Sequence, residues 1–209
     1  MRIFLIGDSI SIHYGPYLEE YLRGTADYSR KGGMDAALKD LDSALGANGG
    51  DSSNVLAYMR AKASTGGFDA DLLMVNCGLH DVKTNPLTGA KQIPEEKYSE
   101  NLEGIVHTAA SIGLPMIWKS TTPCEEKVHN AISKSFFRYS HDVVAYNKIA
   151  ARVMASAGVP VLDLYTFTLN CGKELYCDHV HFSDAVRRLQ AAFIAGWIAC
   201  HESSVFNRK

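Results

Sequence analysis

The chain has 209 residues, of which 46% are hydrophobic, with 17 glycines and 6 prolines. This length allows one good-sized core and no shift in composition divides it, so we expect a single domain over residues 1–209. The formal net charge of −2 gives no electrostatic reason to expect nucleic acid or an anionic membrane surface as a partner. We therefore expect a small-molecule ligand and no nucleic-acid or membrane partner, while the oligomeric state stays open.

Two further features of the sequence bear on where in the cell the protein is expected. No apolar stretch is long enough to span a membrane, and no basic leader with an apolar core precedes the first predicted strand. As written, the chain is therefore expected in the cytoplasm, or in a secreted or periplasmic location if a leader has been removed. Five cysteines lack CxxC spacing and their odd number argues against a fully paired framework, although Cys171 and Cys177 could close a short loop.

Strands and helices alternate along the chain. Apolar runs bounded by glycine or proline predict buried strands at 2–6, 71–76, 115–119 and 159–164, with a weaker strand near 26–30. Helical periodicity predicts helices at about 15–23, 35–45, 52–64, 95–112, 140–157 and 184–200, and segments 82–94 and 121–139 are predicted to be irregular loops. This alternation predicts right-handed crossovers and a parallel sheet with helices on both faces, a three-layer α/β/α sandwich.

The residues that follow the strands are the place to look for chemistry, because open parallel sheets bind ligands at the carboxyl ends of their strands. The first strand runs into "GDSIS", which presents the hydroxyl of Ser9 at a tight turn. This is not the GxSxG of a nucleophile elbow, and the chain contains no GxxxxGK[ST] or GxGxxG. Nucleotide binding therefore has little support.

The last predicted strand is followed by "CDHVH", which places Asp178 and His181 three residues apart before the final helix. On a turn that leads into a helix, such a pair can face one way, so the carboxylate can hold the imidazole that a serine nucleophile needs as its base. A serine at a strand end is, taken alone, more often a turn or cap residue. The combination of Ser9, Asp178 and His181 is what favours catalysis.

Four ordered blocks carry a family resemblance. They are "GDSIS" near the N-terminus, "NGGDSSN" at 48–54, "GLHD" at 78–81 and "DHVH" at 178–181. With them the chain resembles the SGNH (GDSL-type) hydrolases over essentially its whole length, and is most similar to a bacterial branch with GLHD where most members have GxND. The resemblance implies a flavodoxin-like parallel sheet of five strands in the order 2-1-3-4-5.

The resemblance also implies a role for each matching residue. Ser9 would be the nucleophile, His181 the general base, and Asp178 the group that fixes the imidazole tautomer. The backbone N–H groups of Ser9 and Gly50 would form the oxyanion hole. His80 departs from the pattern, because it stands where the family has asparagine; a neutral imidazole has one N–H and can donate in its place.

We therefore expect a serine esterase that needs no cofactor and holds no metal, acting on short-chain, acetyl esters of a carbohydrate. A lysophospholipase or thioesterase type of acyl hydrolase is the nearest alternative. A metal-assisted hydrolase is an alternative of another class, because "CDHVH" gathers Cys177, Asp178, His179 and His181, and HxH on a strand would place both imidazoles on one face. A non-catalytic binding module is the third.

Several polar and aromatic residues have simpler interpretations. His179 is expected to face solvent or a structural partner, and Asp8 and Asp81 are each expected to brace their own turn through backbone hydrogen bonds. No catalytic partner is apparent in the sequence for four other histidines: His107, His129, His141 and His201. Five aromatic residues assigned to loops could stack on a sugar ring or line an acyl groove: Tyr14, Trp118, Phe136, Phe137 and Tyr139.

Overall fold

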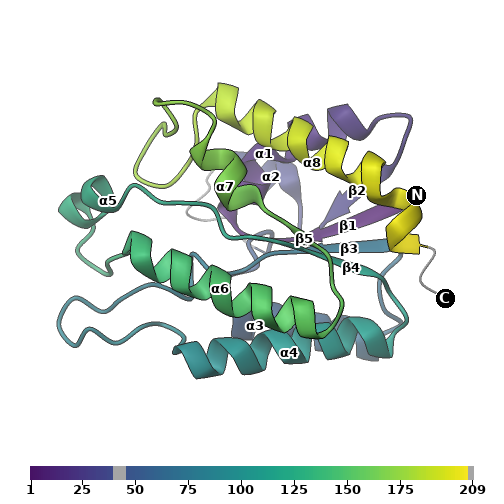
Figure 1. The fold of residues 1–209 in the computed structure, drawn as a ribbon, viewed down its shortest axis with the longest axis horizontal. Helices are drawn as coiled ribbons and strands as arrows, with labels where there is room; N and C mark the ends of the chain where they lie inside the picture. Colours follow the sequence, from purple (N-terminus) through teal and green to yellow (C-terminus); the bar gives the residue numbers. More distant parts are fainter. Residues whose placement is uncertain (40–45, 207–209) are drawn as a thin grey trace.

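A computed structural model describes residues 1–39 and 46–206. Five parallel strands form one sheet in the order β2-β1-β3-β4-β5 (Figure 1). The strands are β1 (Arg2–Ile6), β2 (Asp27–Arg30), β3 (Leu72–Val75), β4 (Met116–Lys119) and β5 (Val161–Leu162). The predicted strand order is confirmed.

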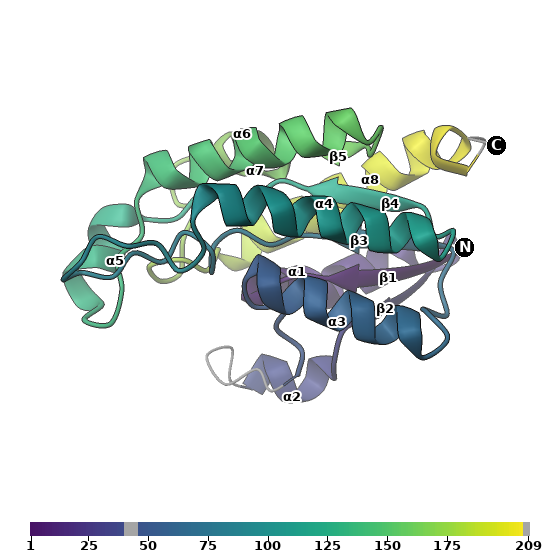
Figure 2. The ribbon, with the colours of Figure 1, turned by 90° about the horizontal axis from the view of Figure 1, so that it is seen from below.

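Helices cover both faces of the sheet. The helices are α1 (Ser9–Leu22), α2 (Met34–Lys39), α3 (Ser52–Ser64), α4 (Glu95–Ser111), α5 (Glu126–Ile132), α6 (Ser140–Ser156), α7 (Leu164–Leu169) and α8 (Asp184–Phe206). Helices α1 and α8 pack together on one face, and α4 packs between α3 and α6 on the other (Figures 1 and 2). The predicted three-layer sandwich is confirmed.

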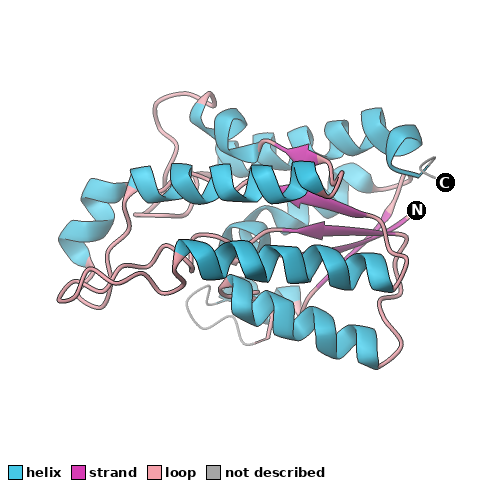
Figure 3. Cartoon of the chain, turned by 60° about the horizontal axis from the view of Figure 1, so that its bottom comes forward, coloured by secondary structure: helices cyan, strands magenta, loops and turns pink. Residues whose placement is uncertain are grey.

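The central strands are buried from both sides. All four side chains of β3 are buried, and its sequence is accordingly the unbroken apolar run "LLMV". The edge strand β2 buries only Arg30, so its pattern is weak. The strands all point toward the end of the molecule where the long loops gather, opposite the N-terminus (Figure 3).

Three predicted elements differ from the structure. Helix α1 begins at Ser9 rather than near residue 15, because Asp8 caps it and its carboxylate accepts the N–H of Ile10. The segment 121–139 is not wholly irregular, since it contains α5, and α7 was not predicted. Both are short helices, of 7 and 6 residues, which carry little periodic signal.

Other boundaries shift by smaller amounts. The helix predicted at 35–45 is α2, which ends at Lys39, and residues 40–45 lie outside the described residues. Helix α8 continues to Phe206. The sulfurs of Cys171 and Cys177 are both free, so the loop they could have closed is not a disulfide loop. Within residues 1–39 and 46–206, no helix combines the length and apolar character needed to cross a bilayer.

Candidate active site

Ser9 lies at the first position of α1, directly after the turn that ends β1. The turn is held by Asp8, which is buried and accepts the N–H of Ile10 at 3.1 Å, as expected for a bracing residue. The hydroxyl of Ser11 adds a hydrogen bond to the Asp8 carbonyl at 2.6 Å. The turn therefore fixes the backbone of Ser9 and leaves its hydroxyl free to face the loop that precedes α8.

Three side chains far apart in the sequence meet at this point. The Nε2 of His181 lies 2.9 Å from the hydroxyl oxygen of Ser9, across 172 positions of sequence. The Nδ1 of the same ring lies 2.7 Å from Oδ2 of Asp178. The structure therefore brings Ser9, His181 and Asp178 into one hydrogen-bonded chain, which is the arrangement of a serine, histidine and aspartate triad.

Asp178 is oriented by its own turn. Its Oδ1 accepts the backbone N–H groups of Val180 and His181, each at 2.7 Å, so the spacing of three residues turns the carboxylate toward the imidazole. Burial raises the pKa of Asp178, but the hydrogen bonds from His181 and Val180 outweigh it and hold that pKa below its ordinary value. The carboxylate stays ionised and can stabilise a protonated His181.

The loop "NGGDSSN" brings Gly50 next to this site. Gly50 adopts a φ of +73°, which favours glycine, and an added Cβ would lie 2.9 Å from the side-chain nitrogen of Asn54. The Gly50 N–H donates to Oδ1 of Asn48 at 2.8 Å. In this state the predicted oxyanion donor therefore already has an acceptor, and that acceptor is a side-chain oxygen.

His80 lies on the other side of the same asparagine. Its Nε2 is 3.5 Å from Nδ2 of Asn48, so the Asn48 carboxamide lies between the two predicted donors, Gly50 and His80. Burial, with Lys83 close by, lowers the pKa of His80 to about 4. The imidazole is therefore neutral at neutral pH and carries a single N–H.

Asp81 joins the two loops rather than bracing its own, which corrects the expectation. Its Oδ1 accepts the N–H of Ser52 at 2.8 Å, at the start of α3. Burial raises the pKa of Asp81 to about 7 despite that hydrogen bond. This contact ties "GLHD" to "NGGDSSN" and sets the position of His80 relative to Gly50.

The two histidines of "CDHVH" serve different partners. His181 contacts Ser9 and Asp178, whereas the Nδ1 of His179 lies 2.7 Å from Nδ1 of the buried His129 on α5. His179 is thus a structural partner of His129, whose pKa is lowered to about 4 by burial and nearby cations. In the described ranges, no group of three or more His, Cys, Asp or Glu side chains is arranged to hold a metal ion.

Comparison with known proteins gives the family. The family model described as GDSL-like Lipase/Acylhydrolase matches residues 5–189, which include all four sequence blocks. The chain belongs to the GDSL-like lipase/acylhydrolase family. As a member of this family, it is an ester hydrolase of the SGNH type. No curated protein matches the chain.

Solved structures share the fold of this GDSL-like hydrolase. A lipase/acylhydrolase from Enterococcus faecalis has 20% identity and a TM-score of 0.71, with 96% of each chain covered. Est24, a carbohydrate acetylesterase from Sinorhizobium meliloti, has 13% identity and a TM-score of 0.68, covering 95% of this chain and 98% of its own. LAE5, an α/β hydrolase from the metagenome of Lake Arreo, has 16% identity and a TM-score of 0.67, with 95% of each chain covered.

Two site residues of this GDSL-like hydrolase were missed by the sequence analysis. His13 lies one turn after Ser9 on α1, and its ring meets that of His181 edge-on, with ring centroids 5.6 Å apart. Burial lowers the pKa of His13 to about 4, so a neutral ring supports the catalytic imidazole. Ser9 and His13 are four positions apart and share one face of the helix, but the sequence reveals this only if the helix is known to begin at Ser9. Asn48 is the second missed residue.

Two aromatic residues assigned to loops lie elsewhere. Tyr14 is in α1 and Trp118 in β4, and both are only 1% exposed, so neither can stack on a ligand. Phe136, Phe137 and Tyr139 are half-buried between α5 and α6, as expected for a loop.

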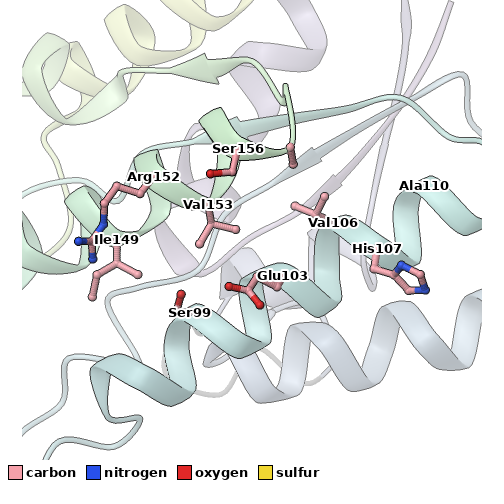
Figure 4. Close-up of a pocket in the computed structure, with 10 residues that line it drawn as sticks. Ser99, Glu103, Val106, His107, Ala110, Ile149, Arg152, Val153 and Ser156 are labelled. Atoms are coloured by element: carbon pink, nitrogen blue, oxygen red, sulfur yellow. The ribbon is translucent and has the colours of Figure 1, made fainter.

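A cavity of the GDSL-like hydrolase between two helices lies away from these residues. It measures about 550 Å³ and lies between α4 and α6, where Glu103 and Val106 face Arg152 and Val153 (Figure 4). None of its lining residues comes from the loops that follow the strands. This cavity therefore does not include the hydrogen-bonded side chains Ser9, His181 and Asp178.

Proposed function

We propose that this GDSL-like hydrolase cleaves carboxylic esters through an acyl-enzyme on Ser9, with His181 as the general base and Asp178 as its orienting acid. The hydrogen-bonded chain from Ser9 through His181 to Asp178, with contacts of 2.9 and 2.7 Å, is the observation that carries the proposal. No cofactor takes part in this mechanism.

The steps follow from the contacts. The Ser9 oxygen bonds to the ester carbonyl carbon while Nε2 of His181 takes the hydroxyl proton. The tetrahedral intermediate then loses the alcohol, to which His181 returns that proton. Water attacks the acyl-enzyme with His181 again as base, and the carboxylic acid leaves as Ser9 regains its proton. Asp178 stabilises the imidazolium that forms in each half of the cycle.

Three groups are proposed to receive the oxyanion. The N–H of Ser9 points out of the first turn of α1, where a helix leaves its donors without acceptors. The Gly50 N–H now donates to Oδ1 of Asn48, and the substrate oxygen would share or replace that acceptor. His80 is proposed as the third donor. Its Nε2 now faces the donating Nδ2 of Asn48 at 3.5 Å, so this role requires the tautomer with the proton on Nε2 and displacement of the Asn48 amide by the substrate oxygen.

The proposed role of His80 predicts a moderate loss of kcat when its side chain is removed. We expect His80→Ala to lower kcat by about 10²-fold, the lower end of the loss of one oxyanion donor, whereas His80→Asn should retain more activity because an amide can donate. Steady-state kinetics on p-nitrophenyl acetate measure both. If both variants turn over at the parent rate, His80 has no part in the oxyanion hole.

For the substrate, we propose short-chain esters, and acetyl esters of a carbohydrate in particular. Two observations support this class. The half-buried rings of Phe137 and Tyr139 offer stacking surfaces, whereas the Phe136 ring is already in contact with Lys83 and Arg138. In addition, the similar structure from Sinorhizobium meliloti is named a carbohydrate acetylesterase.

A panel of esters tests this substrate class. We expect kcat/KM to fall steeply when the acyl group of p-nitrophenyl esters is longer than two carbons, and acetylated sugars to be deacetylated. A maximum at long acyl chains would instead indicate a lysophospholipase or thioesterase type. Turnover of none of these esters would favour a non-catalytic binding module.

A further inference from the structure

A second, smaller pocket lies beside the "GLHD" loop and has a polar lining. Its volume is about 390 Å³. The lining residues are Lys83, Asn85, Ala90, Lys91, Gln92, Ser135 and Phe136. These come from the loop between β3 and α4, which follows a strand, and from the loop between α5 and α6, which follows a helix.

Two lining residues of this pocket connect it to the loops that carry His80 and Gly50. Lys83 follows His80 by three positions, and its charge acts on the His80 ring. Gln92 donates from Nε2 to Oδ2 of Asp51 at 3.4 Å, and Asp51 directly follows Gly50. A group held in this pocket therefore lies next to both loops that face the scissile ester.

Two cations on one ring give the pocket its charge. The Lys83 ammonium lies 4.6 Å from the centroid of the Phe136 ring, and the Arg138 guanidinium lies 4.9 Å from the same centroid. Arg138 is 5% exposed and donates from Nε to the carbonyl of Leu79, the residue before His80, at 2.8 Å. The positive charge thus extends from the pocket to the back of the "GLHD" loop.

Neither charge has a direct ion-pair partner among the described residues, although the carboxylate of Asp51 acts on Lys83 from a greater distance and that of Asp8 acts on Arg138. Among the side chains of the described residues, no carboxylate forms an ion pair with Lys83 or Arg138, whereas Lys91 is paired with Asp142 at 2.8 Å. Burial and the nearby Arg138 lower the pKa of Lys83. Holding the partly desolvated positive charges of Lys83 and Arg138 close together costs free energy. Their contacts with the Phe136 ring offset only part of that cost.

We propose that this pocket binds an anionic group, a carboxylate or a phosphate, carried by the ester substrate. The inference rests on the proposed ester hydrolysis and narrows its substrate class to acidic esters. Lys83 supplies the free charge, Gln92 and Asn85 offer amide donors at the pocket wall, and Arg138 adds positive potential from behind. The occupant would supply the direct ion pair that Lys83 does not have within the described residues.

A matched pair of esters tests the pocket. We compare kcat/KM for 3-acetoxybenzoate with that for its neutral methyl ester, which differs by one charge. The parent enzyme should favour the anionic ester, and Lys83→Gln should lower the ratio of the two values about tenfold, since 1.36 kcal/mol corresponds to a factor of ten. Lys83→Arg should keep most of the preference. Lys148→Gln, which removes an exposed lysine of α6, should keep the parent's ratio.

A binding measurement separates this inference from the proposed function. Calorimetry with glucuronate, glucose 6-phosphate and glucose should show tighter binding of the two anions by the parent, and Lys83→Gln should lose that difference. The tighter of the two anions identifies a carboxylate or a phosphate as the natural group. Equal binding of all three sugars by the parent would contradict the proposal that this pocket binds an anionic group. An unchanged ratio of the two kcat/KM values in Lys83→Gln would contradict it as well. Binding of the anions without turnover of either ester would contradict the hydrolysis instead.

Discussion

Replacing Ser9 by alanine is expected to lower kcat for p-nitrophenyl acetate by at least about 10⁴-fold, because loss of a serine nucleophile leaves only the binding and oxyanion contributions. The fold should be almost unaffected. The hydroxyl makes one side-chain contact, the 2.9 Å hydrogen bond to His181, while the cap of α1 belongs to Asp8. The thermal midpoint of Ser9→Ala should therefore stay close to that of the parent.

The control for this variant is Ser183, a serine outside the hydrogen-bonded chain of Ser9, His181 and Asp178. Ser183→Ala removes a hydroxyl that donates to the carbonyl of Glu174 at 3.2 Å and touches neither Ser9 nor His181. We expect this variant to hydrolyse the ester as the parent does. Retained turnover in Ser9→Ala, with a folded protein, would mean that the nucleophile is assigned to the wrong residue.

The second large effect is expected for Asp178→Asn. The amide can present its NH₂ to Nδ1 of His181, which would leave the proton on Nε2 and remove the lone pair that accepts the Ser9 proton. We expect kcat to fall by about 10⁴-fold with a small change in KM, because a wrong tautomer impairs chemistry rather than binding.

Asp184→Asn is the matched control for this carboxylate. Asp184 lies at the start of α8 in the same region of the chain, and its partners are Tyr17, Arg187 and Arg188 rather than a catalytic imidazole. Asp184→Asn should lower the thermal midpoint because its ion pairs with Arg187 and Arg188 are lost, and its kcat should stay close to that of the parent. If Asp178→Asn and Asp184→Asn have the same kcat, Asp178 does not orient His181.

Most of the sheet could be predicted because its central strands are buried on both faces. The runs at 3–6, 72–75 and 116–118 are apolar without interruption and are followed by polar turns, so their position and parallel direction follow from the sequence. The start of α1 could not be placed in this way. "GDSISIHY" has no clear helical stripe, and Gly15 followed by Pro16 resembles a helix start, since proline is favoured in the first turn.

The same limit applies to the site. Ser9, Asp178 and His181 were chosen from four short blocks, and the structure brings them together within hydrogen-bonding distance. His13 was missed because its place beside His181 depends on α1 already being helical at Ser9. Asn48 looks like an ordinary turn residue in "ANGGD", and only the folded loops place its carboxamide between Gly50 and His80.

The most direct test of the account is covalent labelling with diisopropyl fluorophosphate, which phosphorylates an activated serine as fluoride leaves. Peptide mass spectrometry of the inactivated enzyme should find one diisopropylphosphoryl group, on the peptide that contains Ser9, and none on Ser9→Ala. Inactivation with the label on another residue, or full activity after labelling of Ser9, would contradict it.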